Sequence, residues 1–136
     1  MEFISAEQFL KEDKEVQEVI DNSIKLCIGD RIYHKLSEKY YIYLGEYNEG
    51  FWNVFDLDNK CTGVFCKDYF CRCFTEGELR KFVEDKTGIK HIELVYYPKT
   101  GYDIYTENIL FEDLGNDLLQ SYWKVAVRIA KESIKY

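Results

Sequence analysis

The amino-acid sequence predicts a small α+β protein, and three observations support this fold class. Thr75–Lys86 is a capped amphipathic segment, with apolar residues at helical spacing. A longer helical pattern closes the chain within 113–132. Between these helices and the N-terminus lies a run of short segments rich in aromatic and β-branched residues, which is typical of antiparallel strands. Helices on either side of such a β-rich part indicate the α+β class.

Residues 1–27 predict a helical arm. Ser5 and Gln8 have the spacing of a capping box, and Asp13 is placed to cap a second set of turns. One bent helix and two short helices fit this pattern equally well. The apolar residues of the second part are Val16, Val19, Ile20 and Ile24.

Residues 28–74 predict a small antiparallel β region. Turn residues at 48–50 and 58–60 separate the expected strands. These strands are Arg31–Lys35, Tyr40–Leu44, Trp52–Leu57 and Thr62–Phe65. The order IGDRIYHK…YYIYLGEYNEGFWNVFDLDN resembles an SH3-like module, a fold that binds proteins or nucleic acids and rarely catalyses reactions.

Residues 75–136 predict the order α-β-β-α. Thr75 and Glu78 form a capping box, and Gly88 is placed as a left-handed C-cap. The closing helix starts near Asn116 or Asp117, and we expect it to pack on the sheet. The two expected strands are Ile89–Tyr97 and Tyr102–Leu110. A length of 136 residues without a linker favours one domain over the whole chain.

Composition limits the possible partners. The net charge of −7 disfavours direct binding of nucleic acid, whose phosphates repel an acidic surface. The same acidity suits a protein that imitates nucleic acid, although solubility alone is the ordinary explanation. No apolar run approaches a membrane span, and the N-terminus is acidic and amphipathic, unlike a secretory signal. We therefore expect a cytoplasmic location in the host cell.

The cysteines offer one candidate metal site. Four of the five have the spacing C-x4-C-x4-C-x-C, and zinc requires four ligands that converge tetrahedrally. His34 and His91 would be spare ligands. The alternative is that the thiols are small core residues, because the usual C-x2-C spacing is missing. The candidate zinc ligands are Cys61, Cys66, Cys71 and Cys73.

Catalysis has little support from the sequence. The chain has no Gly-rich phosphate loop, H-E-x-x-H or G-x-S-x-G motif. His34 and His91 are the only histidines available as bases near neutral pH. A Cys–His pair is a weaker alternative, because such partners are distant in sequence. We expect a protein without enzymatic activity.

Two acidic windows without basic residues are the strongest functional lead. They lie between Lys39 and Lys60 and between Lys99 and Lys124, and both contain tyrosines. Tyrosine and tryptophan anchor protein interfaces, and carboxylates steer a surface toward a basic partner. Half-buried strands with aromatic residues inside and acids outside would look the same. The candidate partner-binding residues are Tyr41, Tyr43, Glu46, Tyr47, Glu49, Trp52, Asp56, Asp58, Asp103, Glu107, Glu112 and Asp113.

Two segments also resemble a known group of proteins. FTEGELRKFVEDKTG (74–88) and DLGNDLLQSYWKVAVRIAKE (113–132) are similar to segments of small accessory proteins from clostridial phages and prophages. The resemblance covers roughly the last 60 residues, and the first 25 more loosely. It implies a phage-type accessory protein but no particular activity. Together with the acidity, it favours an inhibitor of a host protein with a basic surface, such as an anti-CRISPR protein that occupies the nucleic-acid groove of a Cas effector.

Overall fold

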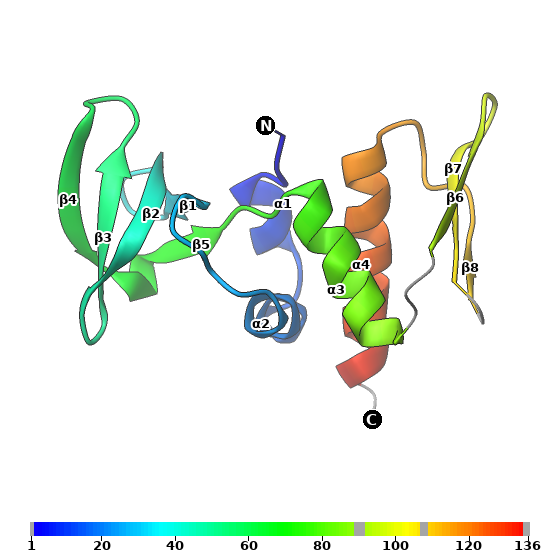
Figure 1. Ribbon diagram of the computed structural model, residues 1–136, viewed down its shortest axis with the longest axis horizontal. Helices are drawn as coiled ribbons and strands as arrows, with labels where there is room; N and C mark the ends of the chain where they lie inside the picture. The colour runs from blue at the N-terminus through cyan, green and yellow to red at the C-terminus, as the bar shows by residue number, and fades with distance from the viewer. Residues whose placement is uncertain (1, 89–91, 107–108, 135–136) are drawn as a thin grey trace. The chain divides into compact units, whose positions relative to one another are not determined.

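A computed structural model describes residues 2–88, 92–106 and 109–134 of the chain, and its fold is α+β, as the sequence predicted (Figure 1). Helices stand at both ends, and two separate antiparallel sheets lie between them in the sequence. None of the helices in the described ranges is long and apolar enough to cross a bilayer. In chain order the elements are α1 (Ala6–Lys11), α2 (Lys14–Ser23), β1 (Arg31–His34), β2 (Lys39–Asn48), β3 (Phe51–Asp56), β4 (Cys61–Cys66), the 3-10 turn η1 (Lys67–Tyr69), β5 (Phe70–Arg72), α3 (Glu76–Thr87), β6 (Glu93–Tyr97), β7 (Gly101–Tyr105), β8 (Leu110–Phe111) and α4 (Leu118–Ile134).

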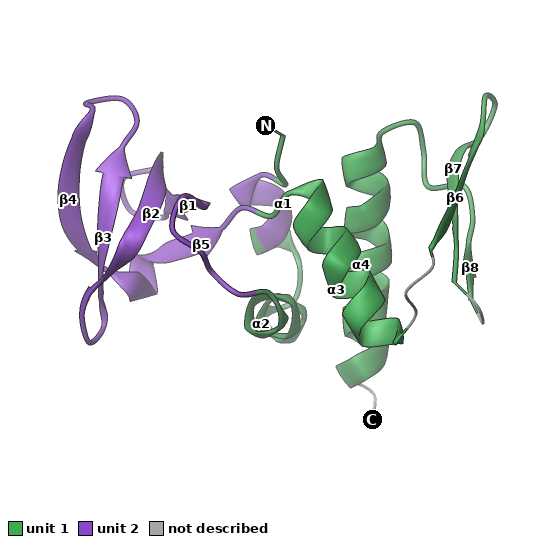
Figure 2. Ribbon diagram, viewed as in Figure 1, with its two compact units in different colours: residues 1–4, 10–24, 74–136 green, residues 5–9, 25–73 purple. Residues whose placement is uncertain are grey.

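The chain forms two compact units (Figure 2). Unit 1 contains residues 1–4, 10–24 and 74–136, and unit 2 contains residues 5–9 and 25–73. The N-terminal arm is therefore not a separate part, because most of it belongs to the same unit as the C-terminal half. Unit 1 has 17 acidic and 11 basic residues, a net charge of −6, whereas unit 2 has 8 and 7, a net charge of −1. Nearly all of the excess negative charge is therefore in unit 1.

Unit 2 is built on a five-strand antiparallel sheet in the order β4-β3-β2-β1-β5. The four expected strands are present, together with a fifth, Phe70–Arg72, that was not predicted from the sequence. All three of its residues are buried, so it lacks the inside–outside alternation that reveals a strand. Between β4 and β5 the described residues show no strand pairing, so the hydrogen-bonded ladder does not close into a barrel. The core of this sheet is Ile32, Tyr41, Tyr43, Val54 and Phe70.

Unit 1 combines three helices with the three-strand antiparallel sheet β6-β7-β8. We expected the closing helix to pack on the sheet, but its main partners are α2 and α3. The sheet meets α4 through Phe111 of β8, whose ring lies 5.2 Å from the guanidinium carbon of Arg128. The second expected strand, Tyr102–Leu110, is in fact β7 and the first residue of β8.

The helix ends mostly follow the capping residues in the sequence. Thr75 and Glu78 form the complete capping box of α3, and Gly88 ends that helix in the left-handed conformation, with φ +70°. Ser5 Oγ accepts a hydrogen bond from the Gln8 N–H at 3.2 Å. Asp13 stands at the N-cap of α2 but makes no side-chain cap, which differs from the expectation. Of the two arrangements that fitted the sequence, one bent helix or two short helices, the structure has two short helices.

Candidate protein-binding surface

The small sheet of unit 1 has two different faces. Ile104 and Phe111 are buried on the inner face, where Phe111 contacts Arg128 of α4. Side chains alternate along a strand, so the neighbours of Ile104 and Phe111 within their strands point to the opposite side of the sheet. We call that side the outer face; its residues, from the register of the three strands, are Glu93, Val95, Tyr97, Asp103, Tyr105 and Leu110.

Tyrosines and carboxylates interact on the outer face. A hydrogen bond with Tyr97, together with burial, raises the pKa of Tyr105, and the negative charges of Asp103 and Glu112 raise it further. Tyr105 therefore remains protonated at neutral pH, and Glu112 lies close enough to affect it. Tyr97 is exposed. The face thus presents phenol rings beside carboxylates, a combination suited to cations and to aromatic or guanidinium groups.

The second acidic window is only partly a surface. Glu112 and Asp113 are exposed, as expected of partner-binding residues. Asp103 is buried, and its Oδ1 accepts a hydrogen bond from the Asp113 N–H at 3.0 Å, so it holds the chain after β8 in place. Its assignment to a binding surface is wrong, because the carboxylate is already used within the fold. Glu107 lies outside the described residues.

Strand β6 adds surface residues that the sequence analysis missed. Leu94, Tyr96 and Tyr97 are 41%, 50% and 46% exposed, although they point to both sides of the sheet. The signal that was available is the absence of a polar face in ELVYY, which a half-buried edge strand would normally have.

Three aromatic members of the first acidic window lie in or against the core of unit 2. Tyr41 and Tyr43 are 4% and 8% exposed, so neither belongs to an open binding surface. Trp52 is half-buried; its ring stacks on Phe70 with centroids 5.6 Å apart and meets Tyr43 edge-on at 5.0 Å. These three assignments are corrected for one reason. The alternation of the strands directs these rings to the covered face of the sheet.

The remaining members of the first window are at the surface. Glu46, Tyr47 and Glu49 lie exposed at the end of the β2–β3 hairpin, and Asp58 is exposed in the turn after β3. They belong to unit 2, whereas Glu112 and Asp113 belong to unit 1. The hairpin residues therefore remain a second, separate candidate surface.

Asp56 is a structural residue and not a partner-binding one. Its carboxylate is buried and accepts hydrogen bonds from Lys39 Nζ at 2.9 Å and from the N–H groups of Asp58 at 2.9 Å and Asn59 at 3.1 Å. The hydrogen bond from Lys39 and those from the turn lower the pKa of Asp56 from 3.8 to about 2. The carboxylate closes the β3–β4 turn, which is why an acid stands there.

The variant Asp56→Asn should destabilise unit 2 at neutral pH. Since the folded pKa is depressed, the ionised carboxylate stabilises the fold fully above pH 3.8, and this contribution disappears as the pH falls toward about 2. The urea midpoints of wild type and variant should therefore differ at pH 7 and converge near pH 2. Asp58→Asn, at an exposed neighbour, is the matched control and should stay close to wild type. Equal midpoints for Asp56→Asn and wild type at pH 7 would contradict the prediction.

The four candidate zinc ligands do not converge. Cys61 and Cys66 stand at opposite ends of β4, so about 16 Å of extended chain separates them. Cys71 and Cys73 are buried. Among the described residues no group of three or more His, Cys, Asp or Glu side chains could hold a metal ion. The zinc site predicted from these four residues is therefore wrong.

His34 is enclosed by aromatic rings. Its ring lies 4.8 Å from Phe70 and 5.2 Å from Phe65, and Nδ1 accepts the Ser37 N–H at 3.0 Å. Burial lowers the pKa of His34, so the imidazole is neutral at pH 7. This histidine packs the core of unit 2 and leaves the spare-ligand role without support. His91 lies outside the described residues.

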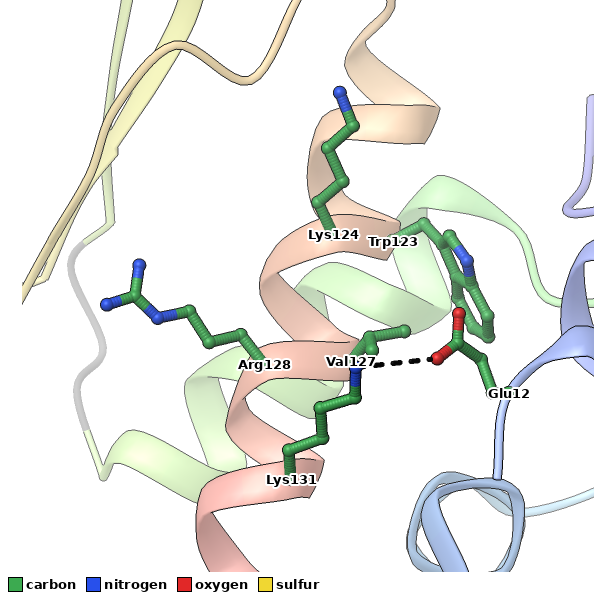
Figure 3. Close-up of a pocket in the computed structure, with 6 residues that line it drawn as sticks. All are labelled: Glu12, Trp123, Lys124, Val127, Arg128 and Lys131. Atoms are coloured by element: carbon green, nitrogen blue, oxygen red, sulfur yellow. Dashed lines mark ion pairs between the residues drawn. The ribbon is translucent and has the colours of Figure 1, made fainter. Parts of the chain in front are cut away.

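A hollow of about 270 Å³ lies on α4, lined by three basic side chains (Figure 3). Lys131 points to Glu12, with Nζ and carboxylate oxygen 3.9 Å apart, while Lys124 Nζ donates to the Leu114 carbonyl at 3.0 Å. Arg128 turns away from Glu12 and lies over Phe111. Lys124, Arg128 and Lys131, which we call the basic stripe of α4, therefore interact with groups of the protein itself. Trp123 and Val127 give the hollow apolar walls.

Comparisons with protein-family models, with curated proteins and with solved structures found no match to the chain.

Proposed function

We propose that this chain is a non-enzymatic binding protein that docks the outer face of the β6–β8 sheet onto a basic surface of another protein. The observation that carries the proposal is the grouping of Tyr97, Tyr105 and Glu93 on the outer face, with Glu112 close to Tyr105, while Phe111 on the other face contacts Arg128 of α4. Tyrosine supplies contact area at low entropic cost, and carboxylates attract a basic partner and orient it.

The charge distribution supports the same assignment. Unit 1 carries −6 of the net charge although it also contains the basic stripe of α4. Within 92–117 the only basic residue is Lys99, at the exposed β6–β7 turn. A basic partner would therefore be attracted to this side of unit 1, and the attraction would weaken as salt is added.

The most specific version follows from the resemblance of 74–88 and 113–132 to phage and prophage proteins. In that version the chain acts in the host cytoplasm as an anti-CRISPR-type inhibitor that covers the nucleic-acid groove of a Cas effector. Such a groove is lined by lysine and arginine, which an acidic face would engage in place of phosphates. The test is a pull-down with clostridial effectors and a target-DNA cleavage assay. No capture of any effector, with cleavage unchanged, would remove this version.

Charge reversal on the outer face tests the surface itself. The double variant Glu93→Lys/Glu112→Lys should weaken capture of the effector about tenfold or more, because two attractive contacts become repulsive. The double variant Asp85→Lys/Glu18→Lys, at exposed acids of α3 and α2, changes the net charge by the same amount without touching the face and is the control. Titration of immobilised effector at low and physiological salt would measure both. Equal losses in the two variants would mean that only net charge matters, against the proposed face.

A further inference from the structure

The open edge of β6 is the second feature of the small sheet. The sheet order β6-β7-β8 leaves β6 with a hydrogen-bonded neighbour on one side only, within the described residues. An edge strand presents unpaired N–H and C=O groups, and extended peptides bind sheets by completing such an edge. Edge strands are normally protected by charges, proline or a covering segment. Glu93 is the only charged residue of β6.

The hydrogen bonds of β7 show which β6 groups face the open edge. The Tyr102 N–H donates to the Gly115 carbonyl at 2.8 Å, and the Tyr102 carbonyl accepts the Leu114 N–H at 2.9 Å. Both backbone groups of Tyr102 thus point away from β6. In an antiparallel pair, two opposing residues exchange both bonds or neither. Tyr96, the partner of Tyr102, therefore directs its N–H and C=O outward.

The same alternation applies to Leu94. Its partner on β7 is Ile104, two residues after Tyr102, so the backbone groups of Ile104 point the same way as those of Tyr102. Two residues further on, the Thr106 N–H donates to the Ile109 carbonyl at 2.9 Å, again away from β6. Leu94 and Tyr96 therefore offer four backbone groups in register along the open edge. Val95, between them, bonds to β7 instead.

We infer that an extended basic segment of the partner binds here as a fourth strand, beside β6. The inference rests on the proposed function and specifies how the partner is held. An added strand would place alternate side chains on the two faces. One set would contact the exposed Leu94 and Tyr96, and the other would lie beside Glu93 and the Tyr97 ring. The fitting sequence alternates apolar with basic residues.

Charge selects this occupant over a second copy of the chain. Pairing β6 with β6 of another copy would bring together two units of net charge −6. Like charges oppose such an approach, whereas a lysine-rich strand is attracted to Glu93 and Glu112. Self-association through the edge is accordingly an outcome that would overturn the inference.

The test uses the full chain and a capped heptapeptide of alternating lysine and valine, with fluorescence anisotropy as the readout. Leu94→Pro removes one outward N–H but leaves the β6–β7 bonds intact, because proline is tolerated where the N–H faces away from the ladder. We expect Leu94→Pro to weaken binding at least tenfold, and Leu94→Ala, which keeps the N–H, to weaken it only a few-fold. The amide protons of Leu94 and Tyr96 should exchange more slowly with the peptide bound.

A second arm does not depend on the variant folding. The same heptapeptide with alternate backbone nitrogens methylated should lose binding to wild-type protein, since it cannot complete the edge. Equal binding of Leu94→Pro and Leu94→Ala, unchanged binding of the methylated peptide, or no binding of the lysine–valine peptide would overturn strand addition. Strand addition would also be overturned if the chain dimerised without peptide and the amide protons of Leu94 and Tyr96 exchanged slowly in that dimer. Loss of effector capture in the Glu93/Glu112 double variant but not in Leu94→Pro would retain the proposed function and reject only the added strand.

Discussion

Gly101→Ala should be among the most destabilising single substitutions in unit 1. Gly101 has φ +89°, and a Cβ at this position would lie 2.1 Å from the Gly115 carbonyl oxygen and 2.7 Å from the Gly115 Cα. The obstructing atoms are backbone, so they cannot rotate aside as a side chain does. The left-handed conformation and the overlap together should cost about 3 kcal/mol or more.

The physical consequence reaches the candidate surface. Gly101 and Gly115 form a parallel bridge, and the adjacent bonds of Tyr102 to Leu114 and Gly115 hold the chain after β8 against β7. Forcing Gly115 away would loosen the segment that carries Glu112 and Asp113. The expected result is therefore a lower free energy of unfolding together with weaker binding of the basic partner.

Gly88→Ala is the matched control for this prediction. Gly88 also has a positive φ, +70°, but nothing lies within 4 Å of the Cβ that would be added. This substitution should therefore carry only the conformational cost, about 1 kcal/mol. Urea denaturation of the two variants and wild type, monitored by circular dichroism, separates the conformational cost from the cost of the overlap with Gly115. Equal losses for Gly101→Ala and Gly88→Ala would show that the close approach to Gly115 is not rigid.

Phe82→Ala is the second variant with a large expected effect. Phe82 is 1% exposed on α3, the helix that packs most extensively against α4. Removing a buried phenyl ring loses its transfer free energy and leaves a cavity, which together cost about 3–5 kcal/mol. Because native domains are stable by only about 5–15 kcal/mol, unit 1 should be close to unfolding at room temperature.

Lys81→Ala distinguishes this core effect from a change in helix propensity. Lys81 is the exposed neighbour of Phe82 on the same helix, and alanine there should change stability by less than about 0.5 kcal/mol. Thermal melts of both variants at one protein concentration measure the difference. A loss below about 1 kcal/mol for Phe82→Ala would mean that the α3–α4 contact contributes little to stability.

The helices were the part most fully predictable from the sequence. Thr75, Glu78 and Gly88 specify the ends of α3 through local hydrogen bonds and backbone conformation, and the structure shows all three in those roles. The closing helix begins at Leu118, directly after Asp117, whose Oδ1 accepts the Gln120 N–H at 2.9 Å. These features depend on residues three or four apart, so a single sequence contains the necessary information.

The strands and the candidate surface were less predictable. Phe70–Arg72 becomes a strand because β1 lies beside it, and nothing within three residues indicates that pairing. The two acidic windows look equivalent in sequence. In the structure, however, Tyr41 and Tyr43 lie on the covered face of the larger sheet, whereas Tyr105 lies with Tyr97 on the outer face of the smaller one. Which face of a strand is covered depends on what packs there, and that partner is distant in sequence.

The residue order alone established the α+β class, the caps of its helices, the excess of acid and the lack of a recognisable catalytic motif, because each follows from composition or from neighbours within one turn. Packing decided the rest. It separated the cysteines along β4, turned Asp56 and Asp103 inward to hydrogen-bond nearby N–H groups, and left β6 with an open edge. The Lys39–Asp56 pair, the bond between Asp103 and the Asp113 N–H, and the open edge of β6 depend on contacts between segments that are not neighbours in the sequence. No local pattern encodes such contacts.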